Sequence, residues 1–553
     1  MPVSPRQPST RTRSGSPTSP HEVRATLTRD LLLVVGLALI VRLARLVFLA
    51  PVVEVEGSEY GRIAENLLAG NGYVGLIEGP ELMLPPLFPV AIAAMSWLTG
   101  ADVVLAGRLV SLLAGLVTIV ALYLIGMRCG GRRVALWTGL CAATLPGLVL
   151  SSTAVFSEGL LVAGLSLATL FFMIAVQNRT AVPGLLAGLC FGLAYLTRIE
   201  SIGIAPVAVL LLLVKRPEGR KRSGRLAAAA LVLGFLIAAL PYPVYLENAT
   251  GRLGFAGKSQ RVFATIERFS QGMKLPEANY ALGAQGELEG PWLTPNEHYE
   301  GASLVEIVGR SPGPITSYLF DNVVRTTWML VSGKGVLSLF FLVAFVLAWR
   351  APGRSQQVRA LDLFLLWLCL YVCAVASVYK VLLRYVIPLA IPAAVWGTRG
   401  LFEAMRRRSH WRQLVTPQRV LVAGMALLIL STCRGFFTGF AEFDEANREP
   451  NSAVLELGAW LRNQADEDAI VMASDSRVPF YGGRQWIPLP VTRDVETLRA
   501  YARTTGARYI SLEIPPRGID CVRPGQWFDA TNPAGMKLRC QSRNLKRALF
   551  EFD

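Results

Sequence analysis

Charged residues are scarce in this chain. They make up 17% of its 553 residues, whereas soluble domains carry about 25%. Histidine is scarcer still: the chain has His21, His298 and His410, which lie far apart in the sequence. No Cys/His spacing typical of a zinc site is present in the sequence. The low charge argues against a soluble protein. No cofactor is indicated, and participation of a divalent metal stays open.

Apolar residues take the place of the missing charge. They form 52% of the sequence and come in blocks such as 31–50 and 226–246. A block of about 20 apolar residues matches the thickness of the bilayer core. The first block lacks a small-residue cleavage site, so it is not a signal peptide. Residues 1–28, rich in Ser, Pro and Arg, are expected to be a disordered cytoplasmic tail. The sequence therefore predicts an α-helical polytopic membrane protein.

The net charge of +16 sits in short connections between the apolar blocks. Basic short loops stay in the cytoplasm, so this distribution indicates topology, and no nucleic-acid partner is expected. We predict about 11 transmembrane helices, with the N-terminus cytoplasmic and residues 51–101, 247–330 and 440–553 outside. The predicted spans are 30–50, 102–126, 133–150, 156–177, 181–197, 201–215, 226–246, 331–349, 360–378, 384–402 and 419–438.

The segment after residue 440 has a different character. Its pattern reads helix, strand, helix, strand, which predicts an extracytoplasmic α/β domain over 440–553. Cys521 and Cys540 are the only cysteines in it. Because the outside is oxidising, a Cys521–Cys540 disulfide is a candidate, with two buried free thiols as the alternative.

Three carboxylates, Glu54, Glu56 and Glu59, follow the first apolar block directly. From Tyr60 to Leu68, apolar residues recur at helical spacing, which predicts an amphipathic helix of about 11 residues. Gly70 would end this helix, and Glu56 would lie just before its first turn. A second interfacial helix is expected over 85–100. Two such helices favour a surface groove between this loop and the bundle.

This loop resembles the first outer loop of a known family. The acid before Tyr60, the segment "IAENLLAGNGY" (63–73) and "PPLFP" (85–89) are similar to those of membrane glycosyltransferases of the C-type fold. These enzymes are related to protein O-mannosyltransferases and to the lipid A aminoarabinose transferase. The resemblance implies a C-type transmembrane domain over 29–439 and the outer domain described above.

The resemblance also implies an activity. Such an enzyme is expected to move a sugar from a polyprenyl-phosphate donor to an acceptor hydroxyl of a glycan, lipid or protein, with inversion. Its partners would be that donor, the acceptor and membrane lipids. It would act on the outer face of the plasma or inner membrane of the cell.

The resemblance implies chemical roles for three residues. Glu56, four residues before Tyr60, matches the family's key acid; Glu158 matches a second acid; and Arg384 resembles the basic residue near the donor phosphate. A carboxylate can take the proton of the acceptor hydroxyl, and a guanidinium can stabilise the leaving phosphate. The chain departs from the family's pattern at Glu56, where Asp is usual, at Gly57 and at Leu84.

Other residues are candidates for contacts with substrate, and each has a plainer interpretation. The candidate substrate-binding residues are Glu59, Tyr60, Glu158, Arg198, Lys258, Arg384 and Tyr385. Glu54 and Glu59 are rival bases, and Glu56 could be a solvated loop acid. Glu158 could be a helix-start carboxylate, and Arg384 could be an interfacial anchor. Arg198 could pair with Glu200 at the interface, and Lys258 could be solvated.

Two other classes of protein would explain part of this sequence. A transporter or lipid flippase would have the spans and the charges beside them. It would not need the amphipathic acidic loop or the outer domain, and no internal repeat is apparent. A non-catalytic scaffold that binds through its outer domain is the third alternative.

Overall fold

The structure is a computed structural model, and it describes most of the chain. The described residues are 20–49, 52–77, 79–214, 221–283, 287–294, 301–331, 339–379, 381–407, 451–492, 495–513, 536–544 and 547–552. The predicted span 419–438 and residues 1–19 of the predicted tail lie outside these residues. Residues 20–28, which were expected to belong to that disordered tail, instead form the start of a helix that runs from Pro20 to Leu49. Cys521 lies outside the described residues as well, so its pairing with Cys540 stays a prediction.

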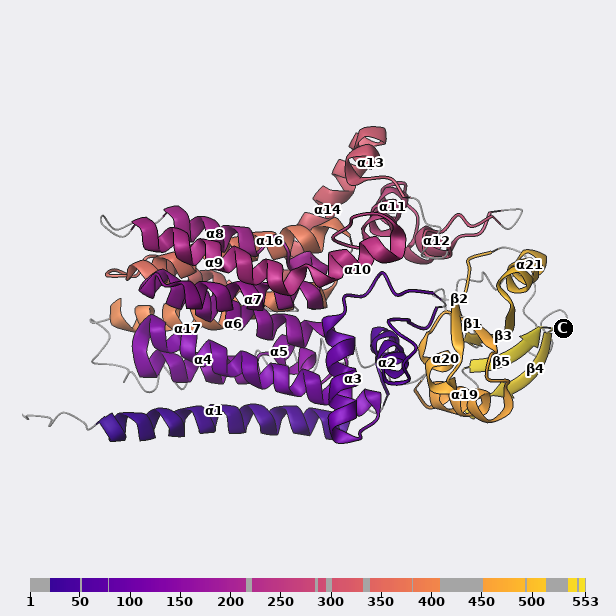
Figure 1. The fold of residues 1–553 in the computed structure, drawn as a ribbon, viewed down its shortest axis with the longest axis horizontal. Helices are drawn as coiled ribbons and strands as arrows, with labels where there is room; N and C mark the ends of the chain where they lie inside the picture. The colour runs from indigo at the N-terminus through magenta and orange to yellow at the C-terminus, as the bar shows by residue number, and fades with distance from the viewer. Residues whose placement is uncertain are drawn as a thin grey trace, which may run out of the picture.

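A bundle of long apolar helices forms the larger part of the molecule (Figure 1). Its main helices are α1 (Pro20–Leu49), α4 (Val103–Thr144), α6 (Ser157–Asn178), α7 (Ala181–Thr197), α8 (Ala205–Val214), α9 (Lys221–Ala239), α15 (Leu339–Trp349), α16 (Gln356–Val378) and α17 (Ala390–Arg407). One large apolar core joins most of them. This confirms a mostly helical fold built on the apolar blocks.

Three of the predicted spans are broken or joined differently in the structure. The expected spans 102–126 and 133–150 form the single helix α4, which kinks at Gly130 and Gly131 and ends at Thr144. Gly131 has φ 74°, a conformation that favours glycine. The expected span 226–246 is divided between α9 and α10 (Pro241–Thr250), which meet at 41°. Pro241 explains this bend, because it lacks the N–H that would continue the helix.

Length and composition alone single out four of the described helices as able to cross a membrane, or five if α9 and α10 count as one span. Helices such as α7 and α8 are apolar but shorter. The number of eleven crossings therefore stays a prediction. The expected loop 247–330 contains a long helix, α14 (Pro312–Val331), that the sequence pattern did not indicate.

Two short helices lie at the end of the bundle next to the C-terminal sheet, which we call the sheet end. They are α2 (Val55–Leu68) and α3 (Leu87–Thr99). Both were predicted, but α2 begins earlier than expected, so that Glu56 lies inside its first turn. The predicted apolar stripe of α2 is buried at Tyr60, Ile63 and Ala64. Gly100, in the left-handed conformation, ends α3.

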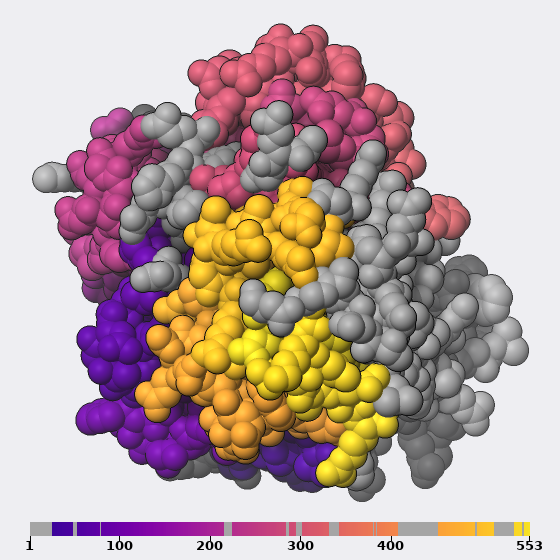
Figure 2. Space-filling view, turned by 90° about the vertical axis from the view of Figure 1, so that its right-hand side faces the viewer, coloured from indigo at the N-terminus to yellow at the C-terminus, as the bar shows by residue number. Residues whose placement is uncertain are grey.

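Helices between residues 241 and 310 also gather at the sheet end (Figures 1 and 2). They are α10, α11 (Ser259–Ser270), α12 (Leu275–Tyr280) and α13 (Leu304–Arg310). Short elements complete the bundle near this end: α5 (Pro146–Ser151) and the 3₁₀ segments η1 (Ile199–Ser201) and η3 (Leu383–Leu389). Segments from all parts of the chain thus converge at one end of the bundle.

The C-terminal residues form a small α/β unit, here the described residues 451–552. Its five strands are β1 (Ile470–Ala473), β2 (Gln485–Pro488), β3 (Ala507–Glu513), β4 (Met536–Gln541) and β5 (Arg547–Phe552), in the order β2-β1-β3-β5-β4. Strand β1 pairs in parallel with β2 and with β3, whereas β5 pairs antiparallel with β3 and with β4. The helices are α19 (Asn451–Gln464), α20 (Arg477–Gly482) and α21 (Val495–Thr505). The predicted α19, β1, α21 and β3 are present; α20, β2, β4 and β5 were not foreseen.

Candidate active site

The predicted site residues come from segments far apart in the sequence that meet at the sheet end. Glu56, Glu59 and Tyr60 lie on α2, and Glu158 lies in the first turn of α6. Arg198 follows the last residue of α7, and Lys258 precedes α11. Arg384 and Tyr385 lie in η3.

Four of these side chains form one chain of ion pairs. Arg384 pairs with Glu56 through Nη1, and its Nε lies 3.7 Å from Glu158 Oε1. Arg198 Nη1 donates to the same Glu158 oxygen at 2.8 Å. Glu158 is 1% exposed, and its other carboxylate oxygen accepts no hydrogen bond within the described part of the chain. Two guanidinium groups therefore converge on one buried carboxylate, beside Glu56.

Lys258 joins the same cluster through Glu200. Lys258 Nζ lies 2.8 Å from Glu200 Oε1, and Arg198 Nε lies 3.6 Å from Glu200 Oε2. The plainer interpretation of Arg198 and Glu200 as an ion pair is thus correct but incomplete. Arg198 also pairs with Glu158, and the solvated interpretation of Lys258 is wrong, since its ammonium is paired.

Tyrosine side chains frame the cluster on two sides. The Tyr60 hydroxyl lies 3.2 Å from Glu56 Oε1 and 3.1 Å from Ser157 Oγ. The Tyr385 ring lies 5.2 Å from the guanidinium carbon of Arg198 and 5.3 Å from that of Arg384. Such cation–π contacts hold flat guanidinium groups in place. The Glu59 side chain, by contrast, has no hydrogen bond or ion pair with another described residue.

The charge state of Glu56 follows from its neighbours. Burial alone would raise its pKa, but the positive charges of Arg384, Arg198 and Lys258 act in the opposite direction. The net effect is a pKa below the usual range of a glutamate. Glu56 is therefore an ionised carboxylate at neutral pH, as a proton acceptor must be.

Glu59, one turn further along α2, is in the opposite electrostatic situation. Burial raises its pKa first, the negative charges of Glu56 and Glu81 raise it further, and Arg384 offsets part of this; the pKa becomes about 8. Glu59 is thus mostly protonated at neutral pH. Neighbouring carboxyl groups with pKa values pushed apart are typical of sites where one accepts and the other donates a proton.

Glu54 has a structural role instead. It is 8% exposed, and its Oε2 accepts a hydrogen bond from the backbone N–H of Val155 at 2.9 Å. Burial raises its pKa, an effect that this N–H partly offsets. Glu54 therefore connects the start of α2 to the segment before α6 through a hydrogen bond. This position argues against Glu54 as a rival base.

Three residues near the cluster were missed as parts of a site. Glu200 bridges Arg198 and Lys258, Ser157 accepts from Tyr60, and the Phe156 ring lies 5.6 Å from the guanidinium carbon of Arg384. Ser157 and Phe156 stand beside Glu158 in the sequence, which was the available signal. On the sequence alone, Glu200 was expected only as an interfacial ion-pair partner of Arg198.

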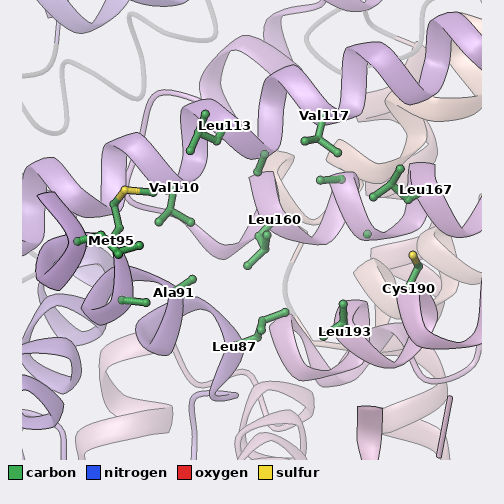
Figure 3. Close-up of a pocket in the computed structure, with 15 residues that line it drawn as sticks. Leu87, Ala91, Met95, Val110, Leu113, Val117, Leu160, Leu167, Cys190 and Leu193 are labelled. Atoms are coloured by element: carbon green, nitrogen blue, oxygen red, sulfur yellow. The ribbon is translucent and has the colours of Figure 1, made fainter. Parts of the chain in front are cut away.

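An apolar cavity of about 410 Å³ lies apart from these charges. It lies between α3, α4, α6 and α7, and its walls carry side chains such as Met95, Val110, Leu160 and Leu193 (Figure 3). None of the charged residues of the cluster lines it. Its carbon-lined walls suit a hydrocarbon chain, whereas the charged cluster offers polar contacts.

Within the described residues, no group of three or more His, Cys, Asp or Glu side chains is arranged to hold a metal ion. The carboxylates of the cluster face cations instead: Glu56 and Glu158 face Arg384, and Glu200 faces Lys258. In the whole cluster, the three cationic side chains Arg384, Arg198 and Lys258 are thus matched by three acidic side chains, Glu56, Glu158 and Glu200. An incoming anion would therefore have to share these cations with the carboxylates.

Comparisons with known proteins agree with this picture. Residues 84–245 match the family model described as dolichyl-phosphate-mannose-protein mannosyltransferase. The lipid A galacturonosyltransferase RgtD of Rhizobium johnstonii is 28% identical over 209 residues. That alignment covers 37% of this chain and 42% of the relative. The chain thus matches less than half the length of this relative.

Solved structures with the same fold cover nearly the whole chain. ArnT from Cupriavidus metallidurans, bound to undecaprenyl phosphate, has a TM-score of 0.56 at 15% identity and covers 94% of this chain and 97% of its own. The oligosaccharyltransferase AglB from Archaeoglobus fulgidus, with an inhibitory peptide and a dolichol-phosphate, has a TM-score of 0.53 at 12% identity. That match covers 89% of this chain and 70% of AglB.

At such low identity these structures show the fold alone, and this chain shares the fold of ArnT and AglB. The expected resemblance is therefore confirmed, and the chain is a multi-pass membrane protein. Neither the family match nor these relatives support the transporter alternative.

Proposed function

We propose that this protein is a membrane glycosyltransferase that moves a sugar from a polyprenyl-phosphate donor to an acceptor hydroxyl. One observation carries the proposal: on a C-type glycosyltransferase fold, the ionised Glu56 lies in one cluster with the cations Arg384, Arg198 and Lys258. A transfer of this kind needs a base for the acceptor and positive charge for the leaving phosphate. The cluster provides both.

Arg384 and Arg198 would bind the donor phosphate. Both are guanidinium groups, which bind phosphate oxygens through paired, charge-assisted hydrogen bonds. The ion pair with Glu56 holds Arg384 at the cluster before the donor arrives. As the phosphate leaves the sugar, its growing negative charge would be stabilised by the same groups. Lys258, steadied by Glu200, would add a third positive charge.

Glu56 would act as the base. It would take the proton of the acceptor hydroxyl as the hydroxyl oxygen attacks the anomeric carbon, while the bond from that carbon to the phosphate oxygen breaks. A single base opposite the leaving group fits inversion at the anomeric carbon. The Tyr60 hydroxyl, 3.2 Å from Glu56 Oε1, would hold the carboxylate in place.

Two further carboxyl groups would contact the substrates. Glu59, with its pKa of about 8, would be protonated and could donate a hydrogen bond to a substrate oxygen. The unpartnered oxygen of Glu158 could accept one from a sugar hydroxyl. Tyr385, already stacked on both guanidinium groups, would form a flat wall beside the sugar.

The arrangement in the membrane is part of the proposal. Residues 29–439 would form the transmembrane domain, with outer loops 51–101 and 247–330, and residues 440–553 would form an α/β domain outside. The basic short loops support this orientation in the plasma or inner membrane. The reaction would then take place on the outer face, where the sheet end lies. The acceptor would be a glycan, lipid or protein that reaches this end of the bundle.

The deciding experiment is transfer by the purified protein in detergent or in liposomes. A panel of radiolabelled polyprenyl-phosphate sugars is offered together with envelope lipids and glycans as acceptors. Transfer of labelled sugar by the parent, with at least a hundredfold loss in Glu56→Gln, is the expected result. Absence of transfer with every donor, together with movement of intact polyprenyl-phosphate sugar across the liposome membrane, would favour the flippase alternative.

A further inference from the structure

The helix that carries Glu56 is held from two sides. On one side it packs on the bundle, and Glu54 at its start is bonded to the backbone of Val155. On the other side lies α20, which belongs to the C-terminal α/β unit (Figure 1). Nothing in the activity proposed above requires the second contact.

Two serine hydroxyls join α20 to the first turn of α2. Ser476 Oγ and Ser58 Oγ lie 2.9 Å apart, and both serines are buried. Each hydroxyl also lies within hydrogen-bond distance of the Val55 carbonyl oxygen, at 3.2 Å from Ser476 and 2.6 Å from Ser58. Val55 and Ser58 stand on either side of Glu56. The C-terminal unit thus touches the backbone turn that presents the proposed base.

Phe480 brings the α/β unit into the core of this region. It is 4% exposed and belongs to the apolar cluster that contains Tyr60, Ile63 and Phe88. Its ring lies so close to α2 that a Cβ atom on Gly61 would be 3.0 Å from the ring. Glycine at this position allows α20 to approach the helix closely. Tyr60, whose hydroxyl bonds Glu56, is therefore packed from the same cluster as Phe480.

The flanks of α2 are held as well. The Tyr481 hydroxyl accepts a hydrogen bond from Val53 N at 3.0 Å, before the helix begins. The backbone N–H of Trp486, at the start of the sheet, donates to the Leu76 carbonyl at 3.0 Å, after the helix ends. Contacts with the α/β unit therefore enclose the whole segment that carries Glu56, Glu59 and Tyr60.

The contacting element is itself fixed in the α/β unit. Asp475, one residue before Ser476, is 5% exposed and pairs with Arg477 at 2.7 Å and with Arg547 of β5 at 3.0 Å. Arg547 also pairs with Glu513 of β3 at 2.6 Å. Buried pairs of this kind are costly to break one partner at a time. The position of α20 is thus tied to the sheet.

We propose that the C-terminal α/β unit positions the proposed base: Ser476, Phe480 and Tyr481 hold α2 so that the Glu56 carboxylate meets Arg384 and Tyr60. These are positioning residues, since none touches the charged cluster in the contacts described. The inference rests on the proposed function, in which Glu56 is the base. It adds that the α/β unit is needed for the chemical step, whereas the donor phosphate is bound by residues that the unit does not contact.

The kinetic test uses matched pairs of variants in the full-length protein. Phe480→Leu and Tyr481→Phe remove packing and one hydrogen bond at α2. Their controls are Phe550→Leu and Tyr501→Phe, buried positions of the α/β unit that contact its own core. A small misplacement of a reacting group can cost on the order of 10²-fold in rate. We expect kcat to fall by about tenfold or more in the first pair, with the donor KM unchanged, and kcat to stay near that of the parent in the controls.

Equal losses of kcat in both pairs would overturn the inference, because loss of stability of the unit alone would explain them. A raised donor KM with unchanged kcat in Phe480→Leu would overturn it too. No transfer by the parent protein would overturn the proposed function instead. These outcomes are distinguishable because the first two require an active parent.

A cross-link tests the contact without any activity. In the Ser58→Cys/Ser476→Cys variant the two sulfur atoms would replace hydroxyls 2.9 Å apart, close enough for a disulfide after mild oxidation. Mass spectrometry of the non-reduced peptides should find this bond. The Ser58→Cys/Thr504→Cys variant, with the second cysteine on α21, should not form one. Absence of the 58–476 bond under oxidant would overturn the inference whatever the transfer assay shows.

Discussion

Arg384 forms an ion pair with Glu56, although 328 residues separate them in the sequence. One comes from a 3₁₀ turn before α17 and the other from the first turn of α2. The pair has a consequence for donor binding, because the Glu56 carboxylate is paired with the guanidinium that the donor phosphate is proposed to use. Base and phosphate therefore compete for Arg384 until the donor is bound.

Glu56→Gln separates the role of Glu56 as a base from its competition with the donor phosphate for Arg384. The amide keeps the size of the side chain but cannot accept the proton of the acceptor, and general-base catalysis is worth about 10²–10⁴ in rate. We expect turnover to fall by at least about 10², while donor affinity stays the same or rises, since Arg384 loses its competing anion. Single-turnover transfer and a separate donor-binding assay measure the two effects. Glu65→Gln, on the same helix, is the control; near-normal transfer by Glu56→Gln would refute the assignment.

Arg384→Ala should have the complementary effect. A hydrogen bond to a charged group contributes about 1.5–3 kcal/mol, so donor affinity should fall by about tenfold or more and turnover should fall with it. Arg384→Lys should restore part of the affinity, because it keeps the charge but not the paired geometry. Arg406→Ala, at an exposed position of α17, serves as the control. Unchanged donor binding in Arg384→Ala would count against the phosphate role.

Glu59 predicts a pH dependence. A carboxyl group with a pKa of about 8 is protonated below that pH and loses its proton above it. If the protonated form donates to a substrate, kcat/KM should fall as the pH rises through about 8. Glu59→Gln keeps an N–H donor at every pH, so this decline should disappear in the variant. The measurement is a profile of kcat/KM from about pH 6 to about pH 9.5 for the parent and for Glu59→Gln. An identical decline in the parent and in the variant would exclude Glu59 as the group that causes it.

The orientation in the membrane can be tested at two exposed positions. Val305 on α13 is 82% exposed, and the Arg406 side chain at the end of α17 is 61% exposed. The distribution of basic loops predicts that α13 faces outward and the end of α17 faces the cytoplasm. Val305→Cys should react with an impermeant thiol reagent in intact cells, and Arg406→Cys only after permeabilisation. The reverse pattern would invert the proposed topology.

Cys521 and Cys540 are predicted to form a disulfide if the α/β domain is external. Closing a loop of this size should stabilise the domain by about 3 kcal/mol in the chain-entropy model. Intact-mass measurement after alkylation, with and without reductant, would reveal the bond. Alkylation of both thiols without reductant would rule it out and would also weaken the external location.

Properties that depend on short stretches of sequence could be predicted well. The apolar blocks predicted the helical bundle, and the spacing of Tyr60, Ile63 and Ala64 predicted α2. The succession of helix and strand patterns after residue 440 predicted part of the C-terminal sheet. The strands β4 and β5 were missed, because the pairing of β5 with β3 and of β4 with β5 depends on the folded unit and not on local pattern. Local propensity is a weak prior that tertiary contacts override.

The sequence by itself determined the class of protein and the group of candidate residues at its site. It placed three acids after the first apolar block, and the family resemblance favoured Glu56, but residue type alone could not give each acid its environment, since Glu54, Glu56 and Glu59 have the same side chain. Only the tertiary structure made Glu54 a buried anchor, gave Glu56 its cations and left Glu59 without one. The physical reason is that a carboxylate takes its charge state from groups within a few ångströms, and here those groups come from segments hundreds of residues away.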